Sequence, residues 1–251
     1  MTHAIAAEWM KVRTLRSTWA LLAGGVIATG VGALILFLLV GSYDAASAAD
    51  RANFETADPT VVTMPFVMFF VGAIGAMLIT SERTPALLAV PQRRVLLSAK
   101  AVVAGLIGLG CGALFALLAF ADARLMLGDR PAPINPWPQW TDAVPTVLCA
   151  TLIMVVTCLV ALGLGTVLRS TAAAITTLGA LVLVCPIFAH FLPAVWQLRF
   201  ASVLLPNLTP QLAGSDHPYL LSQGGAAAVA AVYVIVTLGL GALSFRHRDL
   251  A

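Results

Sequence analysis

The chain has 251 residues, of which 60% are hydrophobic and only 10% are charged, and its formal net charge is +3. An average soluble domain carries roughly 25% charged residues, so a soluble core of this size could not bury so much apolar surface. The basic residues neither cluster nor alternate with aromatic residues, which argues against nucleic-acid binding. We therefore expect an integral membrane protein.

Residues 3–16 are predicted to form an amphipathic helix that lies in the inner membrane interface. Ile5, Trp9 and Val12 fall at i, i+4 and i+7, which places them on one apolar face. A plain cytoplasmic basic leader is the alternative, but it leaves this periodic face unexplained. The residues assigned to the helix and its polar neighbours are Ile5, Glu8, Trp9, Lys11, Val12, Arg13 and Arg16.

Six intervals between charged residues are long enough to cross a bilayer, because a spanning helix needs about 20 predominantly apolar residues. They run over residues 16–44, 58–82, 100–122, 142–169, 169–199 and 216–246, and polar ends trim the last three to 144–168, 172–192 and 224–245. The first interval is too long for a secretory signal peptide. We expect an all-α membrane protein, with six transmembrane helices in one domain that covers residues 1–251.

The longest inner loop covers residues 81–94 and is predicted to contain a short helix. Thr84 can cap a helix that begins at Pro85, and Pro91 must end it after about two turns. Such an exposed apolar helix suits docking into a groove of a partner protein, whereas a simple structural turn is the alternative. The predicted docking residues are Glu82, Arg83, Thr84, Pro85, Leu87, Leu88, Gln92, Arg93 and Arg94.

In the third span, Gly108 and Gly112 form a G-x-x-x-G pair that allows another helix to approach closely. The pair could form a dimer seam, but packing within one bundle is favoured because small residues are common throughout membrane-helix interfaces.

Two outer segments have a distinctive composition. Residues 130–140 contain prolines that prevent a continuous helix and tryptophans that suit the headgroup layer. Residues 193–223 are too apolar for a fully solvated loop, so we expect a partly re-entrant or interfacial segment that the protein shields.

The predicted spans offer little polar chemistry. They contain no Asp, Glu, Lys or Arg, which argues against an ion-coupled transporter. His190 is the one histidine within them, and Cys111, Cys149, Cys158 and Cys185 form no C-x-x-C pair. Hydrolase, metalloprotease and phosphate-loop motifs are absent from the sequence. We therefore expect no catalytic, cofactor or metal site in this chain, and no enzyme activity of its own.

The basic residues predict the orientation in the cell membrane. If the amino terminus is cytoplasmic, ten basic residues fall inside and only four outside, as the positive-inside rule requires. The outer four are Arg51, Arg124, Arg130 and Arg199. Both termini are therefore predicted to be cytoplasmic.

Several segments resemble the permease subunits of ABC transporters of the ABC-2 export type. They are residues 8–18 before the first span, the 81–100 loop with its Leu-Leu-Ala-x-Pro core, residues 168–173, residues 205–207 and residues 245–249. The resemblance covers the whole chain in matching order. At Arg83, Thr84 and Pro85 the family usually carries a longer stretch that includes a Tyr-Arg-x-Gly-like sequence.

This resemblance implies a half-transporter that pairs with a second permease chain, identical or homologous, among membrane lipids. Two separate ATP-binding subunits, which hold the ATP and Mg, would dock at residues 81–94 and at the amino-terminal helix and drive export. The apolar spans favour a hydrophobic or amphipathic cargo, such as a drug, antibiotic or antimicrobial peptide, as in antibiotic resistance or self-immunity. The alternatives are a lipid or polysaccharide exporter and a membrane scaffold or sensor that transports nothing, whereas a passive channel would need a polar lining.

Overall fold

A computed structural model describes residues 2–54, 56–80, 93–215 and 217–246. All regular structure in these ranges is helical, with no strand. The elements are α1 (Thr2–Thr14), α2 (Arg16–Ala45), α3 (Ala48–Arg51), α4 (Pro59–Val62), α5 (Met64–Thr80), α7 (Arg93–Leu127), the 3-10 helix η1 (Trp140–Asp142), α8 (Ala143–Leu168), α9 (Thr171–Gly179), the π-helix η2 (Ala180–Val184), α10 (Cys185–Ala189), α11 (Ala194–Val203), the 3-10 helix η3 (Leu205–Asn207), α12 (Leu208–Ala213) and α13 (Gln223–Arg246).

Five of the described helical segments are long and apolar enough to cross a membrane, which indicates a multi-pass membrane protein. They are Arg16–Ala45, Val95–Leu127, Trp140–Leu168, Thr171–Ala189 and Gln223–Ser244. The helix α5 is also apolar, but it has 17 residues and ends at Thr80, where the described part of the chain stops. The sixth span therefore stays a prediction.

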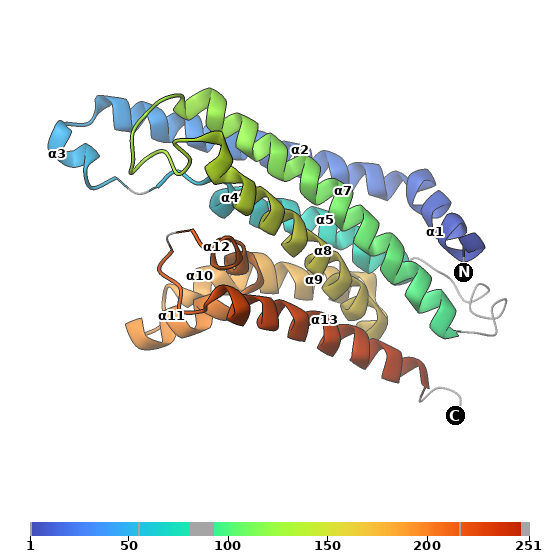
Figure 1. Cartoon of the computed structure of the whole chain (residues 1–251). Coiled ribbons are helices and arrows are strands. Elements are labelled where there is room, and N and C mark those ends of the chain that lie inside the picture. The colour runs from blue at the N-terminus through green and yellow to red at the C-terminus, as the bar shows by residue number, and fades with distance from the viewer. Residues whose placement is uncertain (1, 55, 81–92, 216, 247–251) are drawn as a thin grey trace.

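The helix α8 forms the centre of the bundle, because it contacts α5, α7, α9, α12 and α13. In Figure 1, α2 and α7 lie on one side of α8, and α9 and α13 lie on the other. The helix α5 joins the two groups through contacts with α2, α7 and α9. The main core lies where these helices meet, and Val67, Val71, Ile153, Leu162 and Leu178 are completely buried there.

The G-x-x-x-G pair of α7 packs against α8. A Cβ atom at Gly108 would lie 2.7 Å from the Cα of Val155, and one at Gly112 would lie 3.1 Å from the Cα of Thr151. A Cβ at Gly110, by contrast, would meet no heavy atom within 4 Å. The pair thus serves close packing within the chain, as favoured from the sequence.

The start of α1 and the end of α13 lie at one end of the bundle (Figure 1). We call this the α1 end. At the opposite end lie α3, the 128–139 loop and the α11–α12 segment, and we call this the α3 end.

The 128–139 loop forms no helix, as its prolines predict. The expectation that its tryptophans face lipid headgroups is wrong for Trp137, which is buried in a second apolar cluster with Ile134. The loop is held inward because the Ala57 N–H donates to the Ile134 carbonyl over 3.0 Å, and the Trp137 N–H donates to Asn135 Oδ1 over 3.0 Å. Trp140 remains exposed.

The segment after α10 is a folded helical unit that contacts α8 and α13 through α12. Its buried polar centre is Gln211, whose Nε2 donates to the carbonyls of Ser202 and Asn207 over 2.9 and 2.8 Å. The Oε1 atom accepts from the Leu221 N–H over 3.1 Å. Because its polar groups are hydrogen bonded, Gln211 can be completely buried without leaving an unsatisfied donor.

Candidate functional site

The predicted partner-docking residues Glu82, Arg83, Thr84, Pro85, Leu87, Leu88 and Gln92 lie outside the described residues. The backbone of Arg93 and Arg94 forms the first turn of α7. The described structure on either side of the segment is the end of α5 and the start of α7, both at the α1 end (Figure 1). The candidate site is therefore built from α1, α5 and α7.

The predicted amino-terminal helix is present as α1. It ends at Thr14, because the extended backbone of Leu15 (φ −76°, ψ 122°) breaks the helix before α2 begins at Arg16. The Thr14 hydroxyl donates to the Lys11 carbonyl over 3.0 Å at this last turn. The Trp19 Nε1–H donates to the Arg13 carbonyl over 3.1 Å, which ties the first turn of α2 to the end of α1. We call residues 13–19 the elbow.

The face of α1 that packs on the bundle differs from the predicted one. Val12 is buried and Ile5 packs against the main core, as expected. Trp9, however, is 41% exposed, and the third residue of the inward stripe is Glu8, which is only 2% exposed. The expectation that Glu8 lies on the polar face is therefore wrong, whereas the predicted place of Trp9 in the membrane interface stays a prediction.

The reason for this exchange is Lys100, a completely buried residue of α7. Its Nζ lies 2.8 Å from Glu8 Oε2 and donates to the Leu78 carbonyl of α5 over 2.6 Å. The other carboxylate oxygen, Glu8 Oε1, accepts from Lys11 Nζ over 2.8 Å. A buried charge is tolerated only when it is paired and hydrogen bonded, so the inward face of α1 has to present a carboxylate here.

The Glu8–Lys100 pair thus connects three helices. Glu8 belongs to α1, Leu78 lies two residues before the end of α5, and Lys100 lies within the second turn of α7. We call these residues the α1 anchor. A displacement of any one of the three helices at this end of the bundle therefore pulls on the other two.

The sequence interpretation placed Lys100 at the boundary of the third span, whereas α7 begins at Arg93 and its apolar segment at Val95. The helix α7 thus extends beyond both limits of the predicted third span, and Lys100 lies inside a continuous helix. Asp122 and Arg124 also lie within α7. The sequence signal that could have placed Lys100 inside a helix is the presence of apolar residues on both sides of it, since the end of a span has apolar residues on one side only.

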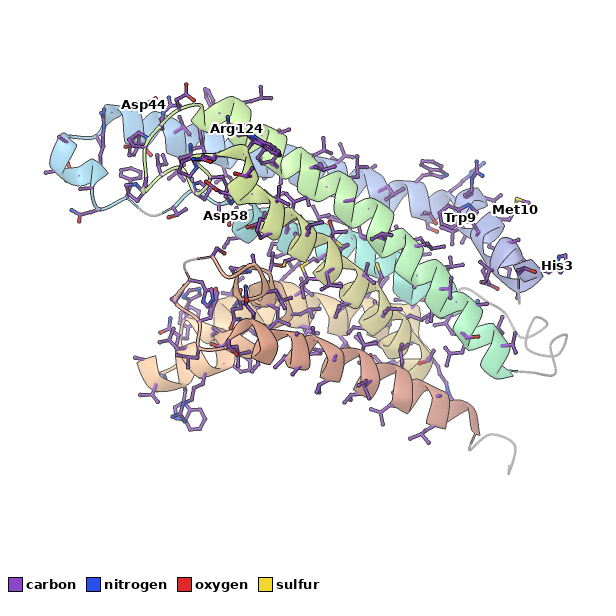
Figure 2. All side chains as sticks on the ribbon, viewed as in Figure 1. His3, Trp9, Met10, Asp44, Asp58 and Arg124 are labelled. Atoms are coloured by element: carbon purple, nitrogen blue, oxygen red, sulfur yellow. The ribbon has the colours of Figure 1, made fainter. Side chains whose placement is uncertain are left out.

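A second polar cluster lies at the α3 end, where Figure 2 shows Asp44, Asp58 and Arg124. The Asp44 carboxylate accepts from Arg130 Nη2 over 2.6 Å and from Arg130 Nε over 3.0 Å. These hydrogen bonds raise the pKa of Arg130 above its usual value. Arg130 also donates to the Leu127 carbonyl, so the cluster fastens the end of α2 to the end of α7. Both partners are partly exposed, which favours a structural role.

Several threonine hydroxyls within the helices are hydrogen bonded to their own helix. The hydroxyls of Thr29, Thr151 and Thr157 donate to carbonyls four residues earlier, over 2.8 to 3.0 Å. All four cysteines, each of which the structure describes, are free. Among the described residues, no group of three His, Cys, Asp or Glu side chains could hold a metal ion.

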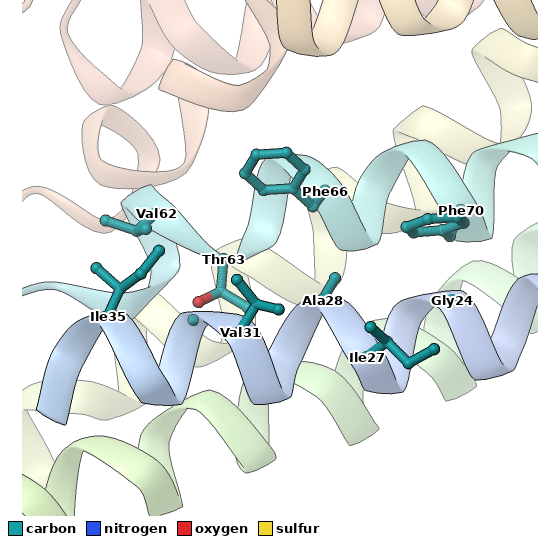
Figure 3. A pocket seen from close by; sticks show the side chains of 10 residues that line it. Gly24, Ile27, Ala28, Val31, Ile35, Val62, Thr63, Phe66 and Phe70 are labelled. Atoms are coloured by element: carbon teal, nitrogen blue, oxygen red, sulfur yellow. The ribbon is translucent and has the colours of Figure 1, made fainter.

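An apolar groove of about 310 Å³ runs along α2 and faces α4 and α5 (Figure 3). Small and aliphatic residues of α2 line one side of it, and the rings of Phe66 and Phe70 line the other. A Cβ at Gly24 would lie 2.6 Å from the Phe70 ring, so glycine is needed for this close approach. The lining residues are Gly24, Ile27, Ala28, Val31, Gly32, Ile35, Val62, Thr63, Phe66 and Phe70. Such a surface can bind a hydrocarbon group but offers only the Thr63 hydroxyl as a polar side chain.

The described structure thus offers three candidate sites. They are the α1 anchor, whose helices α5 and α7 flank the predicted docking loop in the sequence, the polar cluster at the α3 end, and the apolar groove that lies between them along α2. The resemblance to ABC-2 permeases rests on the sequence motifs, because no protein-family model and no curated protein sequence matches this chain.

Proposed function

We propose that this protein is the membrane subunit of an ATP-driven exporter of the ABC-2 type. The observation that carries the proposal is the α1 anchor, which joins α1 to the end of α5 and the start of α7, the two helices that flank residues 81–92 in the sequence. A partner that pushes on the predicted docking loop would move the end of α5 and the start of α7. Because Lys100 holds Glu8, α1 would follow the same movement.

The work is divided between chains in this proposal. Two ATP-binding subunits hold ATP and Mg and dock beneath a pair of permease chains at the 81–94 loop and α1. The permease pair supplies the path through the membrane. The apolar groove along α2 supports a hydrophobic or amphipathic cargo, because its lining offers almost no polar group to a hydrophilic one.

The distribution of charge supports a cytoplasmic α1 end, with six spans and both termini inside the cell. Lys11, Arg13 and Arg16 belong to α1 and to the start of α2. Arg169 joins this end through its Nη2, which donates to the Ser244 hydroxyl of α13 over 3.0 Å. Basic residues mark the cytoplasmic side of a membrane protein.

The proposal is tested by purifying the tagged chain from its native membranes and measuring bound ATPase activity. The variant L87D/L88D should insert normally but lose the co-purified ATPase, since it places charge in the predicted docking helix. The control L220D makes the same kind of substitution once, on an exposed leucine at the α3 end, and should keep the ATPase. Unchanged association in L87D/L88D, or ATP hydrolysis by the chain free of other subunits, contradicts the proposal. A wild-type chain that brings down no ATPase favours the scaffold or sensor alternative.

A further inference from the structure

The outward surface of α1 and the elbow combines basic and large apolar side chains. Met10 is 65% exposed and Trp19 is 61% exposed, and Figure 2 shows Trp9 and Met10 on α1 at the end of the bundle. Arg13 and Arg16 are exposed on the two sides of the Leu15 break. Side chains of these two kinds are the ones that occupy the membrane interface, where aromatic rings sit at headgroup level beside cations.

This surface carries no exposed negative charge. Glu8 is the single acidic residue among the first 43 residues of the chain. It is only 2% exposed, and each of its carboxylate oxygens accepts from a lysine. The α1 anchor therefore removes the one carboxylate of this region from the surface and leaves the arginines to set the local charge.

We propose that α1 and the elbow form a binding surface for anionic phospholipid headgroups. Arg13 and Arg16 pair with the lipid phosphates, while Trp9, Met10 and Trp19 insert their apolar parts among the headgroups. Anionic lipids attract basic residues next to a span, whereas zwitterionic lipids carry no net charge to attract them. The proposal holds whether or not the protein is an exporter.

Continuity with the lipid-facing surface favours lipid over an acidic protein partner. The elbow leads directly into α2, whose Val26 and Ile27 are 59% and 67% exposed. Trp19 lies on the first turn of this apolar helix, and its indole N–H is held by the Arg13 carbonyl. An acidic protein would have to cover tryptophan and methionine at the very place where the helix enters the hydrocarbon layer.

The test uses the full chain in vesicles that contain equal amounts of phosphatidylglycerol and phosphatidylcholine. The protein is extracted in mild detergent, and the two lipids that stay bound are quantified. Wild type should retain phosphatidylglycerol preferentially, and raised salt should weaken this preference. Each arginine removed should lower the preference roughly fivefold, so R13Q/R16Q should show little of it.

The control R199Q removes one arginine from α11 at the α3 end and should keep the preference. A melting curve for each variant checks that the bundle is intact. Equal retention of the two lipids by wild type, or an unchanged preference in R13Q/R16Q, overturns the proposal. So does retention of an acidic protein in place of lipid when the chain is extracted from native membranes.

Discussion

Neutralising Glu8 should release α1 from the bundle. In the variant E8Q, the completely buried Lys100 ammonium would lose the carboxylate that lies 2.8 Å from its Nζ and would meet a neutral amide in its place. Removing one partner of a buried ion pair costs about 3 to 5 kcal/mol. The pair and the packing of Ile5 and Val12 hold α1 against the bundle, so we expect a loss of this size to detach the helix.

The two halves of the pair should respond unequally. K100M leaves Glu8 with Lys11, whose side chain is 46% exposed, so the carboxylate keeps a cation and a route to water. E8Q should therefore cost more than K100M. The double variant E8M/K100M should cost less than E8Q alone, because it leaves no buried charge and two apolar groups can pack together.

Limited trypsin digestion of the protein in detergent distinguishes these outcomes. Cleavage after Arg13 reports a detached α1, while a melting curve reports the rest of the bundle. The variant K11M is the matched control, since it removes only the partly exposed cation and should cost at most about 1 kcal/mol. The reasoning is refuted if E8Q is as protected as wild type, or if K100M exposes the Arg13 site more than E8Q does.

Two further predictions concern packing and pH. G108V should lower the melting temperature of the bundle, by overpacking worth about 1 to 3 kcal/mol, because its side chain would meet the α8 backbone, whereas G110V has open space around it and should not. For Asp58, desolvation raises the pKa above its usual value despite hydrogen bonds from the Thr60 N–H and hydroxyl, so the folded state favours the protonated carboxyl. The protonated Asp58 carboxyl thus contributes to the stability of the folded state at acid pH, and this contribution is lost as the pH rises through the raised pKa. D58N keeps an acceptor for Thr60, so it should melt above wild type at neutral pH, with a difference that closes on acidification; a difference that grows on acidification contradicts this.

Much of the helical framework could be predicted from the spacing of charged residues. The expected fourth and sixth spans, 144–168 and 224–245, agree closely with α8 (Ala143–Leu168) and α13 (Gln223–Arg246). The rule works there because an unpaired charge in hydrocarbon is so costly that it marks the end of the apolar helix. The prediction that Gly108 and Gly112 serve packing within one bundle is also confirmed. It could be made from the sequence because two helices can pack closely only where their residues are small.

The fifth span shows what composition leaves open. Its expected range was 172–192, but the helix ends at Ala189 and passes through a π-helical turn at Ala180–Val184. Pro186 follows this turn and has no N–H to donate to the preceding turn of the helix. The switch from α-helix to π-helix depends on how α5 and η2 pack against each other, and no local pattern of apolar residues encodes that packing.

The burial of Glu8 and Lys100 was missed for one shared reason. A lysine inside an apolar run is interpreted as a boundary, and a glutamate on a short amphipathic helix is interpreted as solvent exposed, because each is costly to bury alone. The two residues are 92 positions apart, so neither local pattern contains the partner that removes the cost. Local rules fail where a long-range pair overrides them, and such places are often functional. Here the long-range pair ties α1 to the bundle, so that any displacement of α1 must either carry α7 with it or break a buried ion pair.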